Sequence, residues 1–283
     1  MLDGQVIKIH SGIYTVLAAG KKYECSARGN LKIKSEGIIT GDYVKIDEAA
    51  ATVDTVLARK SYFVRPSIAN VDAVNVVIAY PPKPDYFMLD KLLLTLFSKD
   101  VEVIISVNKT DLDGGVYSEV YKNYADTGCR MFQVSALTGE GIPELKEFLR
   151  GKLVAFAGQS AVGKSSLVNA LFGLNLKTDD VSVKTGRGRH TTTVSEIFDC
   201  GGIRVADTPG FSIIRPDIPA EDAALYYPEY FKRLGQCKFR CCTHISEPGC
   251  KVLYDVTSGE LSKDRYLRYK NIFAELKQEK SKY

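Results

Sequence analysis

The segment that most constrains the fold of this chain is the octapeptide 158–165, which reads G-Q-S-A-V-G-K-S. An apolar run precedes it, and helical periodicity follows it. Glycines let the backbone of such a strand–loop–helix unit wrap closely around phosphate oxygens and present amide groups to them. The pattern predicts a phosphate loop in which Lys164 neutralises the β and γ phosphates of a nucleotide and Ser165 offers its hydroxyl to Mg²⁺. The residues expected to line this loop are Gly158, Gln159, Ser160, Ala161, Val162, Gly163, Lys164, Ser165 and Ser166.

Two further motifs follow apolar runs that read as strands. Residues 108–111 are N-K-T-D, and residues 135–137 are S-A-L. In a parallel sheet covered by helices, side chains at the carboxyl ends of strands bind ligands. A carboxylate such as Asp111 accepts hydrogen bonds from the ring N–H and the exocyclic amine of guanine, a pairing that adenine cannot provide. The residues expected to hold the base are Asn108, Lys109, Asp111, Ser135 and Ala136.

A third motif predicts the remaining ligands of Mg²⁺. Residues 207–210 read D-T-P-G and follow the predicted strand 203–206, so Asp207 is expected to approach the metal from the edge of the sheet that carries the phosphate loop. Between the two motifs, residues 184–193 form a basic, glycine-rich stretch without apolar periodicity. We expect Thr192 to join Ser165 and Asp207 around Mg²⁺, with Thr191 and Thr193 as alternatives. A solvated loop with incidental threonines is the other interpretation of this stretch.

The order of these motifs is inverted. In an ordinary small GTPase the phosphate loop comes first and the base-reading motifs come last, whereas here the base-reading motifs precede the phosphate loop. Such a permutation moves the ends of the domain. Whatever follows the phosphate half is therefore attached to a segment that responds to the nucleotide.

The distribution of apolar residues, glycines and cysteines along the sequence predicts three domains. Residues 1–65 contain five short strand-like runs separated by glycines, which favours an OB-fold barrel over a generic small β domain. Residues 66–214 alternate apolar strands with amphipathic helices, the pattern of a doubly wound, mostly parallel α/β sheet. Residues 215–283 combine a cysteine-rich stretch with a helical tail over 258–280, which indicates a small helical module held by a metal.

The cysteines of the last domain have the spacing of a zinc site. Four of the seven cysteines lie between residues 237 and 250, and Cys237, Cys242, His244 and Cys250 supply three thiols and an imidazole. That set is enough for one closed tetrahedral site, typical of structural zinc. We expect one Zn²⁺ per chain. Cys241 is expected to be a free thiol or a neighbour of the site, and unligated core cysteines are the competing interpretation.

Composition and charge limit the cellular setting. The hydrophobic content of 45% and charged content of 25% are typical of a soluble protein, and neither a membrane-length apolar run nor a signal peptide is visible. We expect a cytoplasmic monomer with no membrane partner. Residues 1–65 carry ten basic and seven acidic side chains, and residues 215–283 carry thirteen and ten, so each flank has a net charge of +3. Basic flanks are consistent with contact to a polyanion or with a lysine-rich solvated surface.

The combined motifs resemble the RsgA/YjeQ family of circularly permuted GTPases, which assist maturation of the bacterial small ribosomal subunit. The resemblance rests on NKTD, SAL, GQSAVGKSS, GRGRHTTT, DTPGF and the cysteine–histidine spacing, and it covers the whole chain. It implies an OB-fold and a zinc module that contact ribosomal RNA and proteins, and GTP hydrolysis stimulated by the small subunit.

Three positions depart from the patterns of related proteins. Ala161 stands where the family commonly has glycine, and Cys241 stands where glycine is frequent. Phe211 follows the D-x-x-G motif where many signalling GTPases place the glutamine that orients water, a role that an apolar ring cannot fill. The resemblance therefore implies slow hydrolysis by the protein alone, and His190 is our candidate for the group that positions water.

The sequence favours a GTPase whose nucleotide state reaches the zinc module through the segment after residues 207–210, so that hydrolysis is coupled to release from the small subunit. An ATP-dependent phosphotransferase built on the same loop is one alternative, against which Asp111 argues. An RNA-binding protein that does not use its nucleotide is another. The intact Lys164, Ser165 and Asp207 argue against that alternative.

Overall fold

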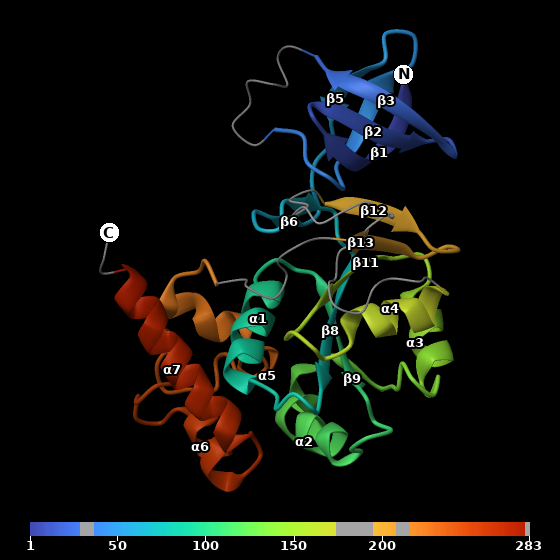
Figure 1. The fold of residues 1–283 in the computed structure, drawn as a ribbon. Helices are drawn as coiled ribbons and strands as arrows, with labels where there is room; N and C mark the ends of the chain where they lie inside the picture. Colours follow the sequence, from blue (N-terminus) through green and yellow to red (C-terminus); the bar gives the residue numbers. More distant parts are fainter. Residues whose placement is uncertain (29–36, 174–194, 208–215, 281–283) are drawn as a thin grey trace.

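The computed structural model describes residues 1–28, 37–173, 195–207 and 216–280, and they form a barrel, a helix-covered sheet and a helical module (Figure 1). The barrel lies beyond one edge of the sheet, and the helical module packs beside helix α1. None of the described helices combines the length and the apolar character needed to cross a membrane.

Five strands of the amino-terminal part close into a barrel. They pair in the order β1-β2-β3-β5-β4, and β4 pairs back onto β1. The β3–β5 pair is parallel and the others are antiparallel. The strands are β1 (Leu2–His10), β2 (Ile13–Ala18), β3 (Lys21–Ala27), β4 (Tyr43–Asp47) and β5 (Thr52–Val56). The predicted OB-like barrel is confirmed.

The barrel is filled by side chains from alternate positions of its strands. Val6, Val16, Val44, Ile46 and Val53 are all completely buried. Because successive side chains of a strand point to opposite faces, the polar residues between them face solvent. A short hairpin of β6 (Tyr62–Phe63) and β7 (Ile68–Ala69) then leads to the sheet. The sequence did not predict this hairpin, and the proposed domain boundary after residue 65 falls inside it.

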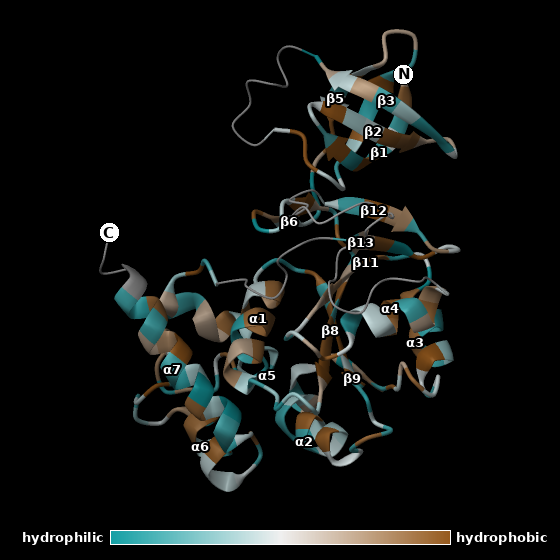
Figure 2. Ribbon diagram, viewed as in Figure 1, coloured by the Kyte–Doolittle hydropathy of each residue, from teal (hydrophilic) through white to brown (hydrophobic). Residues whose placement is uncertain are grey.

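The central sheet has six strands in the order β10-β9-β8-β11-β13-β12. All neighbours are parallel except β12, which runs antiparallel to β13 at the edge. Every residue of β8 is buried, as expected for a central strand covered on both faces (Figure 2). The strands are β8 (Ala73–Ala79), β9 (Glu102–Asn108), β10 (Arg130–Gln133), β11 (Leu153–Ala157), β12 (Glu196–Asp199) and β13 (Arg204–Asp207).

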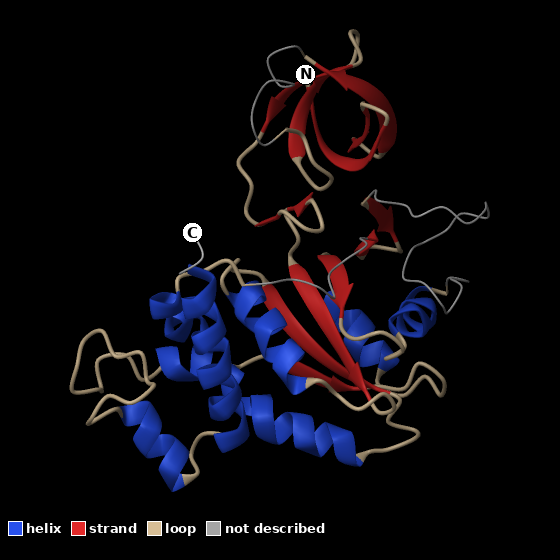
Figure 3. Ribbon diagram, turned by 60° about the vertical axis from the view of Figure 1, so that its left-hand side comes forward, coloured by secondary structure: helices blue, strands red, loops and turns tan. Residues whose placement is uncertain are grey.

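Helices cover both faces of this sheet (Figure 3). One apolar core contains residues of α1 (Tyr86–Phe97) and α2 (Gly115–Tyr124). The other core contains residues of α3 (Ile142–Leu149) and α4 (Lys164–Phe172). The predicted doubly wound domain is confirmed, and its inverted motif order gives the sheet its permuted connectivity.

The carboxy-terminal module is helical. A 3₁₀ helix (Ala220–Tyr226) is followed by α5 (Pro228–Phe231), α6 (Lys251–Ser258) and α7 (Lys263–Lys280). The predicted helical tail began at residue 258, whereas α7 begins at Lys263, and α6 was not predicted. The module's apolar core includes the buried rings of Tyr227, Tyr230 and Tyr269, and it also takes in Leu94 of α1. The proposed boundary at 214/215 lies outside the described residues.

Candidate nucleotide site and metal centre

The phosphate loop runs from the end of β11 to the start of α4, as its sequence predicts. Gly158 has a φ of +133°, and a Cβ there would lie 2.2 Å from the carbonyl oxygen of Val77. Gly163 has a φ of +88°, and a Cβ there would lie 2.5 Å from Nδ2 of Asn108. Only glycine fits these two positions, because other strands approach the loop so closely.

Ala161, between these glycines, has a φ of +63°. An L-residue adopts this left-handed conformation at a cost of roughly 1–2 kcal/mol. The glycine that the resembled family commonly carries at this position would avoid that cost. Ala161 nevertheless adopts this left-handed backbone conformation within the loop.

Lys164 points back into the loop. Its ammonium donates to the carbonyl oxygens of Gly158 and Gln159, at 2.9 and 2.6 Å. Partial burial lowers the pKa of Lys164, because desolvation disfavours the charged form. Ser165 is buried in the first turn of α4, where the amide of Leu167 donates to the carbonyl of Gly163 at 2.8 Å.

Asn108 joins the phosphate loop to both base-reading segments. Its side chain is only 3% exposed. Nδ2 donates to the carbonyl of Val162 at 3.0 Å, and Oδ1 accepts from the amide of Ala136 at 3.0 Å. The ammonium of Lys109 adds a second bridge, since it donates to the carbonyl of Ala161 at 2.8 Å. Segments whose order is inverted along the chain therefore meet at one place.

The carboxylate expected to read guanine is held by the serine of the S-A-L motif. Asp111 is exposed, and its Oδ1 accepts a hydrogen bond from Oγ of Ser135 at 2.6 Å. Ser135 is completely buried, and its Oγ also accepts from the amide of Thr138 at 3.1 Å. A buried hydroxyl with two fixed partners restricts the rotation of the Asp111 side chain.

Only part of the predicted magnesium site lies among the described residues. Asp207 ends β13, which pairs in parallel with β11, so its carboxylate lies at the sheet edge from which the phosphate loop extends. Ser165 approaches from α4. Thr191, Thr192, Thr193, His190 and Phe211 lie outside the described residues.

Sequence reasoning missed two contacts of this site. Oε1 of Gln159 accepts from the backbone amide of Asp85 at 3.0 Å, and the ammonium of Lys109 also donates to the carbonyl of Pro81 at 2.8 Å. Both partners lie in the connection between β8 and α1. No motif marks that connection in the sequence.

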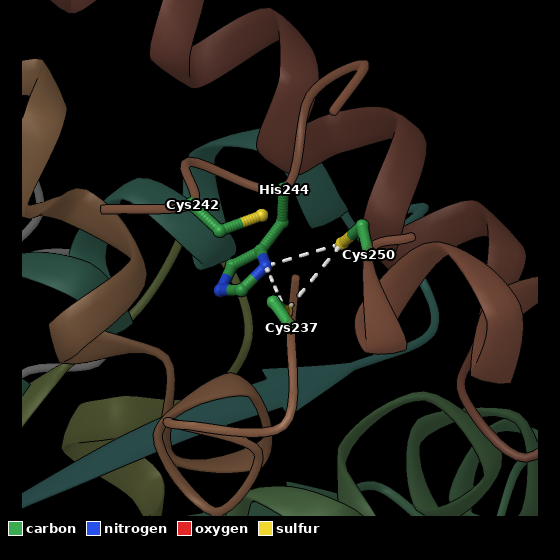
Figure 4. Close-up of side chains that lie close together, drawn as sticks. All are labelled: Cys237, Cys242, His244 and Cys250. Atoms are coloured by element: carbon green, nitrogen blue, oxygen red, sulfur yellow. Dashed lines mark hydrogen bonds between the residues drawn. The ribbon is translucent and has the colours of Figure 1, made fainter. Parts of the chain in front are cut away.

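The four predicted zinc ligands converge (Figure 4). The ligand atoms of Cys237, Cys242, His244 and Cys250 all lie within 4.8 Å of one another. Nδ1 of His244 is 3.3 Å from Sγ of Cys250 and 3.6 Å from Sγ of Cys237, and those two sulfurs are 4.0 Å apart. Zn–S bonds of about 2.3 Å and Zn–N bonds of about 2.0–2.1 Å place tetrahedral ligands roughly 3.5–3.8 Å apart. The cluster is compatible with one zinc ion.

Burial shifts the pKa values of the cluster's side chains. Burial lowers the pKa of His244, which keeps the imidazole neutral. Burial, together with the Cys250 and Cys237 thiols, raises the pKa of Cys242 to about 12. A thiol with such a pKa ionises near neutral pH only if a positive charge compensates it. Cys241 is exposed and stands outside the four.

The loop that carries His244 is fixed by a carboxylate and two tyrosines. The oxygens of Glu247 accept from the amides of Thr243, Ile245 and Ser246. Partial burial alone would raise the pKa of Glu247, but the hydrogen bond from the hydroxyl of Thr243 and those from backbone amides lower it to about 2. The hydroxyl of Tyr266 donates to the carbonyl of His244 at 2.9 Å, and that of Tyr269 donates to the carbonyl of Thr243. These hydrogen bonds fix the backbone of the loop on both sides of His244.

Comparison with known proteins agrees with this geometry. A family model described as RsgA GTPase matches residues 56–216, and one described as RsgA N-terminal domain matches residues 3–54. The chain belongs to the RsgA GTPase family. The resemblance drawn from the sequence is thereby confirmed, as is the assignment to a class of GTP-hydrolysing enzymes.

RsgA relatives match over nearly the whole chain. The small ribosomal subunit biogenesis GTPase RsgA of Geobacillus sp. (strain WCH70) is 40% identical over 293 residues, and the match covers 100% of both chains. The protein of the same name from Moorella thermoacetica is 40% identical, with 97% of each chain covered.

Two solved structures share the fold. YjeQ from Thermotoga maritima has a TM-score of 0.81 and 34% identity, covering 97% of this chain and 98% of its own. YloQ, described as a circularly permuted GTPase, has a TM-score of 0.82 and 29% identity, covering 99% of this chain and 96% of its own. The predicted circular permutation is confirmed.

Proposed function

We propose that this RsgA-family protein hydrolyses GTP while it assists late maturation of the small ribosomal subunit. The proposal rests chiefly on Asn108, which hydrogen-bonds to the phosphate loop and to the S-A-L segment at once. A single nucleotide can contact both segments only if they are neighbours. The names of the curated RsgA relatives supply the ribosomal context.

Different residues of the site bind the base and the phosphates. Asp111, oriented by Ser135, accepts the two donors of guanine, and the ammonium of Lys109 donates to the phosphate loop. Lys164 transfers its donors from the loop carbonyls to the β and γ phosphates, where its charge stabilises the loose transition state of in-line attack by water. His190 is the residue that we propose to position this water.

The remaining polar residues fit a divalent cation beside the phosphates. Mg²⁺ supplies charge neutralisation of the phosphate oxygens when it is bound, and Ser165, Asp207 and Thr192 are the proposed ligands. Asp207 is the last residue of β13 and Ser165 lies in the first turn of α4, at the same edge of the sheet.

We propose that one Zn²⁺ ion per chain is held by Cys237, Cys242, His244 and Cys250. When bound, the ion crosslinks three turns of a module that otherwise has only a modest apolar core. The amides of Lys251 and Leu253 lie 3.3 and 3.5 Å from the sulfurs of Cys237 and Cys250, where their hydrogen bonds stabilise thiolates.

The small subunit, through its RNA and proteins, is the proposed partner of both basic flanks. The protein would act as a cytoplasmic monomer. We further propose that nucleotide state reaches the zinc module through the chain that follows Asp207, so that hydrolysis triggers release from the subunit.

Co-sedimentation with purified small and large subunits, with GTP turnover followed in the same tubes, tests this function. We expect binding to, and stimulation by, the small subunit. Stimulation by the large subunit alone, or a preference for ATP in competition, would refute the proposal. Unchanged subunit affinity with GTP, with GDP and without nucleotide would instead favour a nucleotide-independent RNA-binding protein.

The Lys164→Ala variant separates the chemistry from the fold. We expect it to lose GTP turnover and to keep its zinc content, because the lysine lies in the phosphate loop and the zinc ligands lie in a separate module. Loss of zinc from this variant would show that the zinc ligands need an intact phosphate loop in order to fold.

A further inference from the structure

Helix α1 lies between the phosphate loop and the helical module. Its first backbone donor is held by the loop, since Oε1 of Gln159 accepts from the amide of Asp85, the residue that caps the helix, at 3.0 Å. The carboxylate of Asp85 in turn accepts from the amide of Met88 at 2.9 Å. Amides at a helix start have no partner within the helix, so the phosphate loop completes the capping of α1.

Gln159 also contacts the residue that must respond to a nucleotide. Its carbonyl oxygen accepts from the ammonium of Lys164 at 2.6 Å. In the proposed function that ammonium moves to the β and γ phosphates. Such a movement removes a hydrogen bond from the backbone of the residue whose side chain caps α1.

The middle of α1 is fixed to the helical module by buried charges. Asp90 is completely buried and accepts hydrogen bonds from Arg265 and Arg268 of α7. The hydroxyl of Tyr124 also donates to it, at 2.8 Å. Arg265 is itself 3% exposed and pairs with the buried Glu229 of the module. Removing one partner from such a network leaves an uncompensated buried charge.

These contacts join α1 to α7. Leu94 of α1 is part of the module's apolar core, so packing and ion pairs hold the same interface. A change at the amino-terminal end of α1 is therefore passed to α7 and cannot be absorbed by sliding between them.

We propose that α1 couples the phosphate loop to the zinc module, through the contact of Gln159 with the amide of Asp85 and the contacts of Asp90 with Arg265 and Arg268. This coupling rests on the proposed function and adds a route separate from the chain after Asp207. Nucleotide at the phosphate loop changes the stability of α7 by this route.

Amide hydrogen exchange of residues 263–278, with and without saturating GDP, measures the coupling. In the wild type we expect GDP to change the exchange rates of α7 about three- to tenfold, the range that one net hydrogen bond supports. Asp85→Pro removes the amide that Gln159 holds. Its φ of −87° lies near the range of proline. We expect this variant to lose the response of α7 to GDP.

Asp85→Ala is the matched control, because it loses the same carboxylate cap and keeps the amide. We expect it to retain the response. A second variant serves if the proline variant fails to fold: Gln159→Leu removes the side-chain acceptor of the Asp85 amide, and we expect it to lose the response of α7 at a GDP concentration that saturates it. Retention of the full response in Asp85→Pro or Gln159→Leu would overturn the route.

Fluorescent GDP titration of the same samples separates two kinds of failure. A wild type that does not bind GDP would refute the proposed function and the coupling with it. A wild type that binds GDP without any change in α7 exchange would refute the coupling alone.

Discussion

Replacing Asn108 with alanine should weaken nucleotide binding far more than a single lost hydrogen bond would. The side chain is 3% exposed and serves the carbonyl of Val162 and the amide of Ala136, each at 3.0 Å. Leaving a buried polar group without its partner costs about 1–3 kcal/mol, so two such groups cost about 2–6 kcal/mol. At about 1.4 kcal/mol per tenfold change, even the lower value corresponds to about a 30-fold loss of affinity.

Most of the free-energy cost of Asn108→Ala should appear as weaker nucleotide binding. Val162 and Ala136 lie on different loops, and each group can be hydrated when the loops separate. A bound nucleotide requires the loops to stay together, so the complex bears the penalty. Titration with a fluorescent GDP analogue measures the dissociation constant directly.

Thr110→Val provides the comparison. The hydroxyl of Thr110 donates to the carbonyl of Val134 at 3.0 Å, within the base-reading half, and this contact does not involve the phosphate loop. Losing it costs about 1 kcal/mol, or about fivefold in affinity. If Asn108→Ala binds GDP within about threefold of the wild type, the idea that the two halves must be held together by this residue is wrong.

Three other changes probe separate parts of the molecule. Asp111→Asn should transfer preference from guanine to xanthine nucleotides in competition assays, because an amide can donate to the carbonyl that xanthine carries in place of the amine of guanine; continued guanine preference would count against the assigned role. Cys250→Ser should lose its zinc by elemental analysis while Cys241→Ser keeps it, since only Cys250 belongs to the cluster. Glu247→Gln should lower the melting temperature of the module above pH 4.5, and the difference from the wild type should vanish as the pH falls towards 2, because the folded-state pKa of this carboxyl lies at about 2, below its ordinary 4.5. A difference that does not depend on pH would show that charge is not the cause.

Local patterns predicted the sheet and the loops at its edge. The strand before the phosphate loop is a short apolar run bounded by glycines, and β11 covers residues 153–157 as expected. Strand ends in a parallel sheet share one edge, which is why motifs 50 residues apart, such as those at Asn108 and Gly158, could be placed together. The zinc ligands follow one another within 14 residues, so their spacing alone was informative.

Contacts between domains could not be predicted in this way. Asp90 stands in an apolar helix and must have a partner, but nothing in the sequence selects Arg265, which is 175 residues away. Helix α6 was missed because it is eight residues long and its start is capped by the sulfur of Cys250, a proposed zinc ligand, which no propensity scale describes. The capping of α1 by Gln159 could not be predicted from the sequence either, because it depends on how two loops meet in space.

The single pairing of Lys8 with Glu196 gives the barrel a protective role that is independent of any ligand. Strand β12 is the last strand of the α/β sheet, and β1 of the barrel meets its outer side at the pair Lys8 and Glu196, whose side chains form a salt bridge of 2.8 Å. Exposed sheet edges are templates for aggregation, and charged side chains or a covering element suppress it. The barrel supplies a charged side chain, Lys8, and a neighbouring strand, β1. A fragment without the barrel would lose this contact with β12 and should self-associate more than the full chain during expression.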